Sequence, residues 1–182
     1  MLEGKTVNLR TMEREDVDFL AEHLNDINCM GEHWWTLEQR SKSDFMKRLD
    51  NPSNLEVLIE AKFFIIQKKD GTRIGEIRHF LDLPHGLMEL ACWLVLSERK
   101  KGYATEATQL MVDYLFLSKQ IARIQATVEV RNVASQKVLE KVGFQREGTV
   151  RDIGFERGEW RDYHLYSILR REWKEPKILT RT

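Results

Sequence analysis

The segment from residue 87 to residue 142 constrains the fold more than any other part of the chain. The apolar run LMELACWLVL at 87–96 predicts a buried strand, and apolar residues recur at helical spacing after the short loop that follows it. RIQATVEV at 123–130 predicts a second strand, and the next helical pattern begins near Asn132 and ends at Gly143. Two strands connected by a helix pair in parallel, so this order predicts a sheet that helices cover.

Two hairpins predict antiparallel pairing in the rest of the sheet. Asp70-Gly71 is a strong turn signal between two strand-like runs, and Arg157-Gly158 separates two more runs near the C-terminus. We therefore predict an α/β (α+β) fold in one domain, residues 1–182, with a central mixed, mostly antiparallel sheet flanked by helices. The other predicted elements are a strand at 6–11, a helix at 14–25, an irregular segment at 27–36, and a helix that follows the capping-box sequence TLEQ at 36–39 and ends near residue 49.

Composition is that of an ordinary soluble globular protein, since 42% of the 182 residues are hydrophobic and 32% are charged. No apolar stretch approaches the roughly 20 residues that cross a bilayer, and the N-terminus lacks the apolar block of a signal peptide. Cys29 and Cys92 lie far apart and have no metal-type spacing. We predict free thiols in a reducing cytoplasm, no metal site and no membrane association.

The charges are balanced overall but not along the chain. With 29 basic and 29 acidic residues, the protein has no general attraction to nucleic acid. Residues 13–60 contain 12 acidic and 5 basic side chains, a net charge of −7, whereas residues 61–182 contain 16 acidic and 22 basic ones, a net of +6. Two interpretations are open: the two parts bind ligands of opposite charge, or both are solvated surfaces.

A basic loop connects the strand at 87–96 to its helix. Arg99, Lys100 and Lys101 are followed by Gly102, which permits unusual dihedrals and a close approach of the backbone to a ligand. The first N–H groups of a helix have no intrahelical acceptor, and the helix macrodipole adds positive charge there. These features predict a seat for a phosphate or pyrophosphate group, and a solvated turn is the alternative.

Two motifs in this segment resemble the GCN5-related N-acetyltransferase (GNAT) superfamily. RKKGYA at 99–104 is similar to the family's acyl-CoA-binding motif, Arg/Gln-x-x-Gly-x-Gly/Ala, and NVASQKVLEKVGF at 132–144 resembles its second motif, Asn-x-x-Ser ending in Lys-x-Gly-Phe. The tail at 147–173 is similar to the branch that acetylates ribosomal-protein N-termini and to spermidine acetyltransferases. The resemblance covers about residues 5–173. It departs from many relatives at Lys100, where they carry glycine, and we expect lysine to be tolerated if the local dihedrals are ordinary.

The resemblance implies transfer of an acetyl group from acetyl-CoA to a primary amine. It implies that pantetheine lies along the strand at Leu94, Val95 and Leu96, where the sheet is expected to splay. Asn132 and Ser135 are expected to contact the CoA arm, although an N-cap explains Asn132 equally well. The pyrophosphate is expected to bind the backbone N–H groups of the loop: Arg99, Lys100, Lys101, Gly102, Tyr103, Ala104 and Thr105.

The acceptor amine must lose a proton before it attacks, because its pKa is about 10.4 for a lysine-like amine and about 8 for an α-amine. Glu89 and Glu76 are candidates to accept that proton, since both lie on strands expected to flank the cleft. A glutamate near a strand end that only reaches solvent is the alternative for Glu89. Ser135 is a candidate to relay a proton to the sulfur, with Tyr163 and Tyr166 as alternatives. Direct attack needs no enzyme nucleophile.

Cys92 is interpreted as a small buried hydrophobe, because the sequence shows no activating base near it. The resemblance places the acceptor between the two N-terminal helices and the last hairpin. Glu32, Trp34 and Trp35 lie in the loop between those helices and, with Glu76, are candidates to bind a cationic small-molecule or peptide amine. The tryptophans are otherwise explained as a cover for the core. We expect a monomer or homodimer, and a non-catalytic acyl-CoA-binding sensor is the alternative function.

Overall fold

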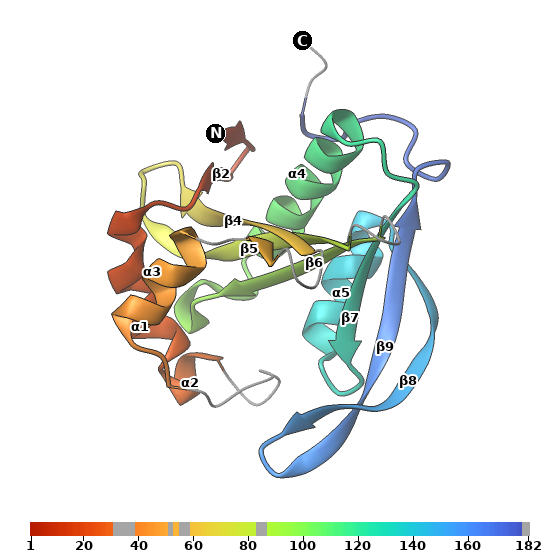
Figure 1. Cartoon of the computed structure of the whole chain (residues 1–182). Coiled ribbons are helices and arrows are strands. Elements are labelled where there is room, and N and C mark those ends of the chain that lie inside the picture. The colour runs from red at the N-terminus through yellow and green to blue at the C-terminus, as the bar shows by residue number, and fades with distance from the viewer. Residues whose placement is uncertain (31–38, 51–52, 55–58, 83–86, 180–182) are drawn as a thin grey trace.

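One mixed sheet runs through the computed structural model, which describes residues 1–30, 39–50, 53–54, 59–82 and 87–179. Its strands follow the order β1-β2-β4-β5-β6-β7-β9-β8, and β3 pairs with β4 at the side of this path (Figure 1). The predicted mixed, mostly antiparallel sheet is confirmed. The strands are β1 (Leu2–Glu3), β2 (Val7–Thr11), β3 (Ser53–Asn54), β4 (Ile59–Lys68), β5 (Arg73–Asp82), β6 (Leu87–Leu94), β7 (Arg123–Glu129), β8 (Gln145–Glu156) and β9 (Glu159–Leu169).

Helices cover both faces of the sheet. On one face, Tyr114 of α4 meets Phe64 of β4 edge to face, with ring centroids 5.9 Å apart, and α5 packs beside α4. On the opposite face, Phe19 of α1 stacks on Trp93 of β6 at 5.9 Å. The helices are α1 (Val17–Leu24), α2 (Ile27–Met30), α3 (Lys42–Asp50), α4 (Tyr103–Ser118) and α5 (Val133–Val142), with 3₁₀ turns at Arg14–Asp16 and Leu96–Glu98. None of the described helices is long and apolar enough to cross a membrane.

The start of α3 differs from the prediction. The helix begins at Lys42, because Ser41 and Asp44 form the capping box that the sequence analysis assigned to 36–39. The N–H of Asp44 donates to Ser41 Oγ at 3.2 Å, and the N–H of Ser41 donates to Asp44 Oδ2 at 3.1 Å. A further difference is α2, which forms within the segment predicted to be irregular.

The C-terminal segment after β9 is fastened to α4 by one buried carboxylate. Asp113 is fully buried, and its Oδ1 accepts hydrogen bonds from Trp173 Nε1 and Gln109 Nε2, both at 2.9 Å. Its Oδ2 accepts the backbone N–H groups of Lys177 and Ile178, also at 2.9 Å. With the N–H of Leu179, which donates to Oδ2 at 3.4 Å, five donors satisfy this buried charge, so the tail is an integral part of the fold.

Candidate active site

The parallel strands β6 and β7 pair over only two residue positions and then diverge. Met88 lies opposite Ile124, Glu89 lies opposite Gln125, and no later residue of either strand is in this pairing (Figure 1). β5 stays paired with β6 along the whole length of β6. The sheet is therefore open on one side of β6 beyond Glu89, which is the splay that the resemblance implied.

The backbone groups that face this gap follow from the pairing of β5 and β6. The N–H of Val95 donates to Ile74 O at 2.9 Å, so Val95 points its backbone groups toward β5. Because successive residues of a strand point these groups in opposite directions, Leu94 and Cys92 point theirs toward the gap. Leu94 thus lies where the sequence analysis placed a pantetheine contact, whereas the N–H of Val95 is already used. Leu96 lies beyond the strand and its carbonyl accepts the N–H of Arg99.

The loop between β6 and α4 presents consecutive free backbone donors. Within the described part of the chain, the N–H groups from Lys100 to Thr105 have no protein acceptor, and the first intrahelical bond of α4 runs from Glu106 N to Gly102 O at 3.1 Å. Gly102 has φ +89°, and a Cβ there would meet no heavy atom within 4 Å. The loop therefore has both the exposed donors and the open space that an anion requires.

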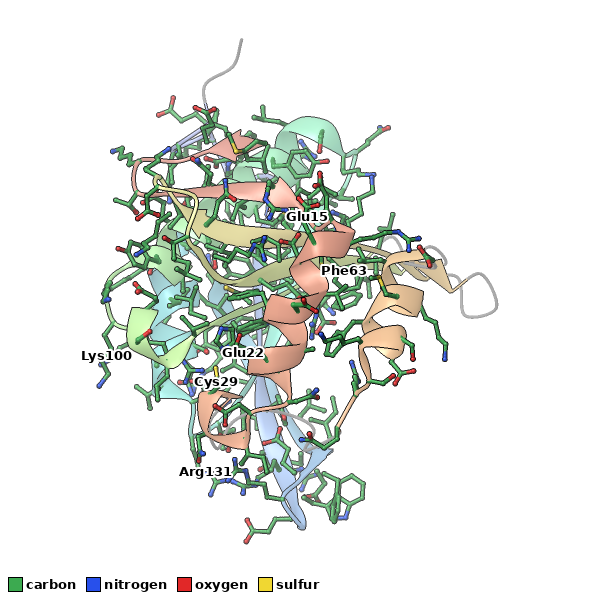
Figure 2. All side chains as sticks on the ribbon, turned by 90° about the vertical axis from the view of Figure 1, so that its left-hand side faces the viewer. Glu15, Glu22, Cys29, Phe63, Lys100 and Arg131 are labelled. Atoms are coloured by element: carbon green, nitrogen blue, oxygen red, sulfur yellow. The ribbon has the colours of Figure 1, made fainter. Side chains whose placement is uncertain are left out.

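Lys100 does not have the ordinary dihedrals on which its tolerance was expected to depend. Its φ is +62°, in the left-handed region that favours glycine. Such a φ suits the glycine that the resemblance led us to expect here, and it means that lysine is held there at a conformational cost of roughly 1–2 kcal/mol. Lys100 itself projects into solvent at the margin of the molecule (Figure 2).

The other two basic side chains of the loop have protein partners. Lys101 Nζ lies 3.0 Å from Glu98 Oε2. Arg99 points inward and donates to two backbone carbonyls, those of Leu94 and Cys29. The side chain of Arg99 is therefore occupied by the protein, although the loop as a whole remains basic.

The start of α5 lies on the other side of the gap. Asn132 is the N-cap: its Oδ1 accepts the N–H of Ser135 at 3.1 Å, and its carbonyl accepts that of Gln136 at 3.2 Å. The N-cap interpretation of Asn132 is thus confirmed, and a contact with CoA stays a prediction. Ser135 is half-buried in the first turn, and its hydroxyl has no partner among the described residues.

The two candidate bases lie on the face of the sheet that α1 covers. Glu89 sits where β6 and β7 part, is half-buried, and accepts a hydrogen bond from Thr127 Oγ1 at 3.1 Å. Glu76 of β5 is 1% exposed and lies 2.9 Å from Arg78 Nη1. Glu89 is the more accessible of the two and lies where the strands part, so the geometry favours Glu89 over Glu76 as base.

Cys92 is unsuited to nucleophilic attack. Burial, together with the negative charge of Glu76, raises the pKa of its thiol to about 12. The thiol is thus protonated at neutral pH, whereas the thiolate is the reactive form. Its backbone, which faces the gap, was missed by the sequence analysis, and only the strand pairing could have revealed it.

A charged cluster at the end of β7 was also missed. Glu129 is 2% exposed, lies 2.9 Å from Arg131 Nε and 4.0 Å from Arg161 Nη1, and stands opposite Tyr163 of β9. Glu156 of β8 is equally buried. The only signal in the sequence was the density of alternating charges in the last hairpin. Of the predicted acceptor residues, Glu32, Trp34 and Trp35 lie outside the described residues. The described residues contain no cluster of three metal-binding side chains.

Comparisons with known proteins agree with this architecture. A family model described as an acetyltransferase (GNAT) domain matches residues 6–145. The chain is 33% identical over 169 residues to the uncharacterized N-acetyltransferase p20 of Bacillus licheniformis, covering 92% of this chain and 94% of that protein. It is 28% identical over 172 residues to the ribosomal protein uS5-alanine N-acetyltransferase of Escherichia coli, covering 91% and 88%. The chain therefore belongs to the GNAT acetyltransferase family and is an acyltransferase, specifically an N-acetyltransferase.

The fold is shared with a solved structure at lower identity. Spermidine N-acetyltransferase from Vibrio cholerae, in complex with CoA and spermine, matches with a TM-score of 0.81 and 21% identity over 92% of this chain and 97% of that one. The enzyme assignment replaces the alternative of a non-catalytic acyl-CoA sensor.

Proposed function

We propose that this protein transfers an acetyl group from acetyl-CoA to a primary amine by direct attack in the gap between β6 and β7. The observation that carries the proposal is the continuity of the gap with the donor-rich loop. Backbone groups of Cys92 and Leu94 line one side of the gap, and the N–H groups from Lys100 to Thr105 lie at its end. A pantetheine chain with amides and a pyrophosphate at its end fits this order of groups.

The residues of the chain would act on the reaction as follows. Acetyl-CoA supplies the acetyl group as a thioester. A gap-facing N–H, from Cys92 or Leu94, is placed to stabilise negative charge on the thioester oxygen during attack. Glu89 would take a proton from the acceptor ammonium, directly or through water. Ser135, at the start of α5, would pass a proton toward the departing sulfur, whose pKa is about 8.5 in a simple thiol.

The acceptor is proposed to be a cationic amine that enters from the α1 side of the sheet. Residues 13–60 carry a net charge of −7, and a surface of one sign raises the rate of encounter with ligands of the other. Names of similar proteins mention both an N-terminal alanine of a ribosomal protein and spermidine, so a peptide N-terminus and a polyamine are the two classes to test. Two free thiols in Cys29 and Cys92 support a reducing, cytoplasmic location.

The test is release of the CoA thiol from acetyl-CoA with a panel of amines: a polyamine, a basic peptide and an amine with a neutral body. We expect release with at least one of them. Glu89→Gln should lower kcat/KM by about 10²–10⁴-fold. Glu3→Gln, at the far edge strand β1, is the matched control and should be neutral. Absence of release with every amine, while CoA still binds, would contradict the proposal.

A further inference from the structure

The loop that carries the free N–H groups also carries one side chain that reaches across the fold. Arg99 Nε donates to Leu94 O at 3.0 Å, and Nη2 donates to Cys29 O at 2.5 Å. Leu94 is a gap-facing residue of β6, and Cys29, which lies seventy residues before Arg99, belongs to α2. The guanidinium therefore bridges the gap-lining strand β6 and α2, which packs against α1, through two neutral carbonyls.

The stability of α2 depends on contacts with the rest of the fold. A helix of four residues is far below the length at which helices are stable alone. The carbonyl of Cys29 accepts Arg99 Nη2, so the guanidinium supplies α2 with a hydrogen bond to a distant part of the chain. The side chain of Cys29 is only 6% exposed and lies further into the molecule than Lys100 (Figure 2).

A second contact supports the same docking. Burial raises the pKa of the Cys29 thiol. A hydrogen bond from the backbone of Leu96 and the positive charge of Arg99 act in the opposite direction and lower that pKa. Both ends of the residue, its sulfur and its carbonyl, thus meet the segment 94–99. That segment connects the gap directly to the loop with the free N–H groups.

We infer that Arg99 is a positioning residue that couples the cosubstrate loop to α2, and so governs the use of the acceptor rather than affinity for CoA. The inference rests on the proposed function for where the acceptor enters. An anion bound to the N–H groups that follow Arg99 fixes the backbone from which its side chain extends, which holds the carbonyl of Cys29 in place. The reciprocal gain in affinity for CoA is small where α2 is already docked before CoA binds.

Cys29 provides a direct test, because it is one of only two cysteines in the chain. In a Cys92→Ala background, the rate at which a thiol reagent such as DTNB modifies Cys29 reports the fraction of molecules with α2 undocked. Arg99→Lys keeps the positive charge, but its single ammonium lacks the planar fork that serves both carbonyls. The loss of one charge-assisted hydrogen bond predicts modification that is about tenfold faster. CoA should slow the reaction in the parent and slow it less in the variant.

Arg171→Lys is the matched control, since Arg171 is exposed on the turn after β9, and it should leave the modification rate unchanged. In the wild-type background, Arg99→Lys should raise KM for the acceptor several-fold while the Kd for CoA, measured by calorimetry, stays close to the parent value. An unchanged rate of Cys29 modification in Arg99→Lys would overturn the inference. So would loss of CoA affinity as the main effect, because the guanidinium would then be an anion ligand.

Failure of the inference and failure of the proposed function can be told apart. Cys29 modification without any ligand measures the docking of α2 whether or not the protein transfers acetyl groups. If the parent binds no CoA and acetylates no amine, the proposed function fails, yet faster modification in Arg99→Lys still establishes the bridge.

Discussion

α4 and α5 begin in opposite ways, although each follows a strand of the same parallel pair. Asn132 closes the start of α5, with Oδ1 on the N–H of Ser135. α4 starts at Gly102, which has no side chain to cap it, and the N–H groups from Lys100 to Thr105 have no acceptor in the described ranges. A helix start that its own sequence satisfies needs no ligand, whereas an uncapped one leaves donors available to an anion. The difference supports the predicted phosphate seat by an observation that is separate from the motif.

The largest effect is expected from a negative charge placed at the uncapped start of α4. Gly102→Glu adds a negative charge where the pyrophosphate is expected, and like charges in contact cost several kcal/mol, so CoA affinity should fall by more than about a hundredfold. Calorimetric titration with CoA measures it, and circular dichroism checks the fold.

Gly102→Ala separates charge from backbone strain. A Cβ at this position meets no atom within 4 Å, so alanine adds only the conformational cost of φ +89°, about 1–2 kcal/mol. We expect alanine to lower stability and to retain most CoA affinity. Equal loss of affinity in the alanine and glutamate variants would mean that loop geometry, not charge, is the cause.

The closed start of α5 should respond in stability instead. Asn132→Ala removes the acceptor for the N–H of Ser135, which typically costs about 1 kcal/mol, and Asn132→Ser should restore most of it. Urea unfolding measures the free energy. CoA affinity should fall far less than in Gly102→Glu; a comparable loss would show that Asn132 acts mainly on the ligand.

The sequence predicted the parallel unit well because its signals are local. The apolar strand, the basic loop and Gly143, with φ +115° at the end of α5, each act within a few residues. The resemblance placed the splay of the sheet near Leu94, but the residue after which it begins, Glu89, could not be predicted, since it depends on where β6 and β7 stop pairing. For the same reason, the sequence did not show that the backbone groups of Cys92 face the gap.

Side-chain roles were predicted less well, for a related physical reason. Arg99 was assigned through its place in a motif, but its side chain meets Cys29, seventy residues away. Asp113 attracted no notice, because a buried carboxylate with backbone donors from a distant tail leaves no periodic signal. Only contacts distant in sequence distinguish such residues from ordinary helical ones.

A milder change should sharpen the comparison at the open start. Lys100→Gly removes the strain of a non-glycine residue in the left-handed region, which should stabilise the folded protein by about 1–2 kcal/mol. Glycine also raises the entropy of the unfolded chain, which costs roughly 0.5–1 kcal/mol of stability. The melting temperature should therefore rise slightly. Lys100→Ala removes the same charge but keeps the Cβ, so it should show no such gain. If both variants melt alike, strain at this position is negligible.

The smallest expected effect is at the start of α3. This start is also capped, but by the side chain of Asp44, which titrates. Hydrogen bonds from the side chain and backbone of Ser41 lower the pKa of Asp44 below its ordinary value. A lowered carboxyl pKa contributes stability above the unfolded pKa, and that contribution is lost as pH falls through the folded one. Asp44 should thus titrate by carbon-13 NMR at a lower pH than a free aspartate, and Ser41→Ala should move its pKa back up. The amide signal of Ser135, capped by a side chain that does not ionise, should stay constant over the same range. If the amide of Ser135 moves with Asp44, acid unfolds both starts together, and the capping box does not act locally on α3.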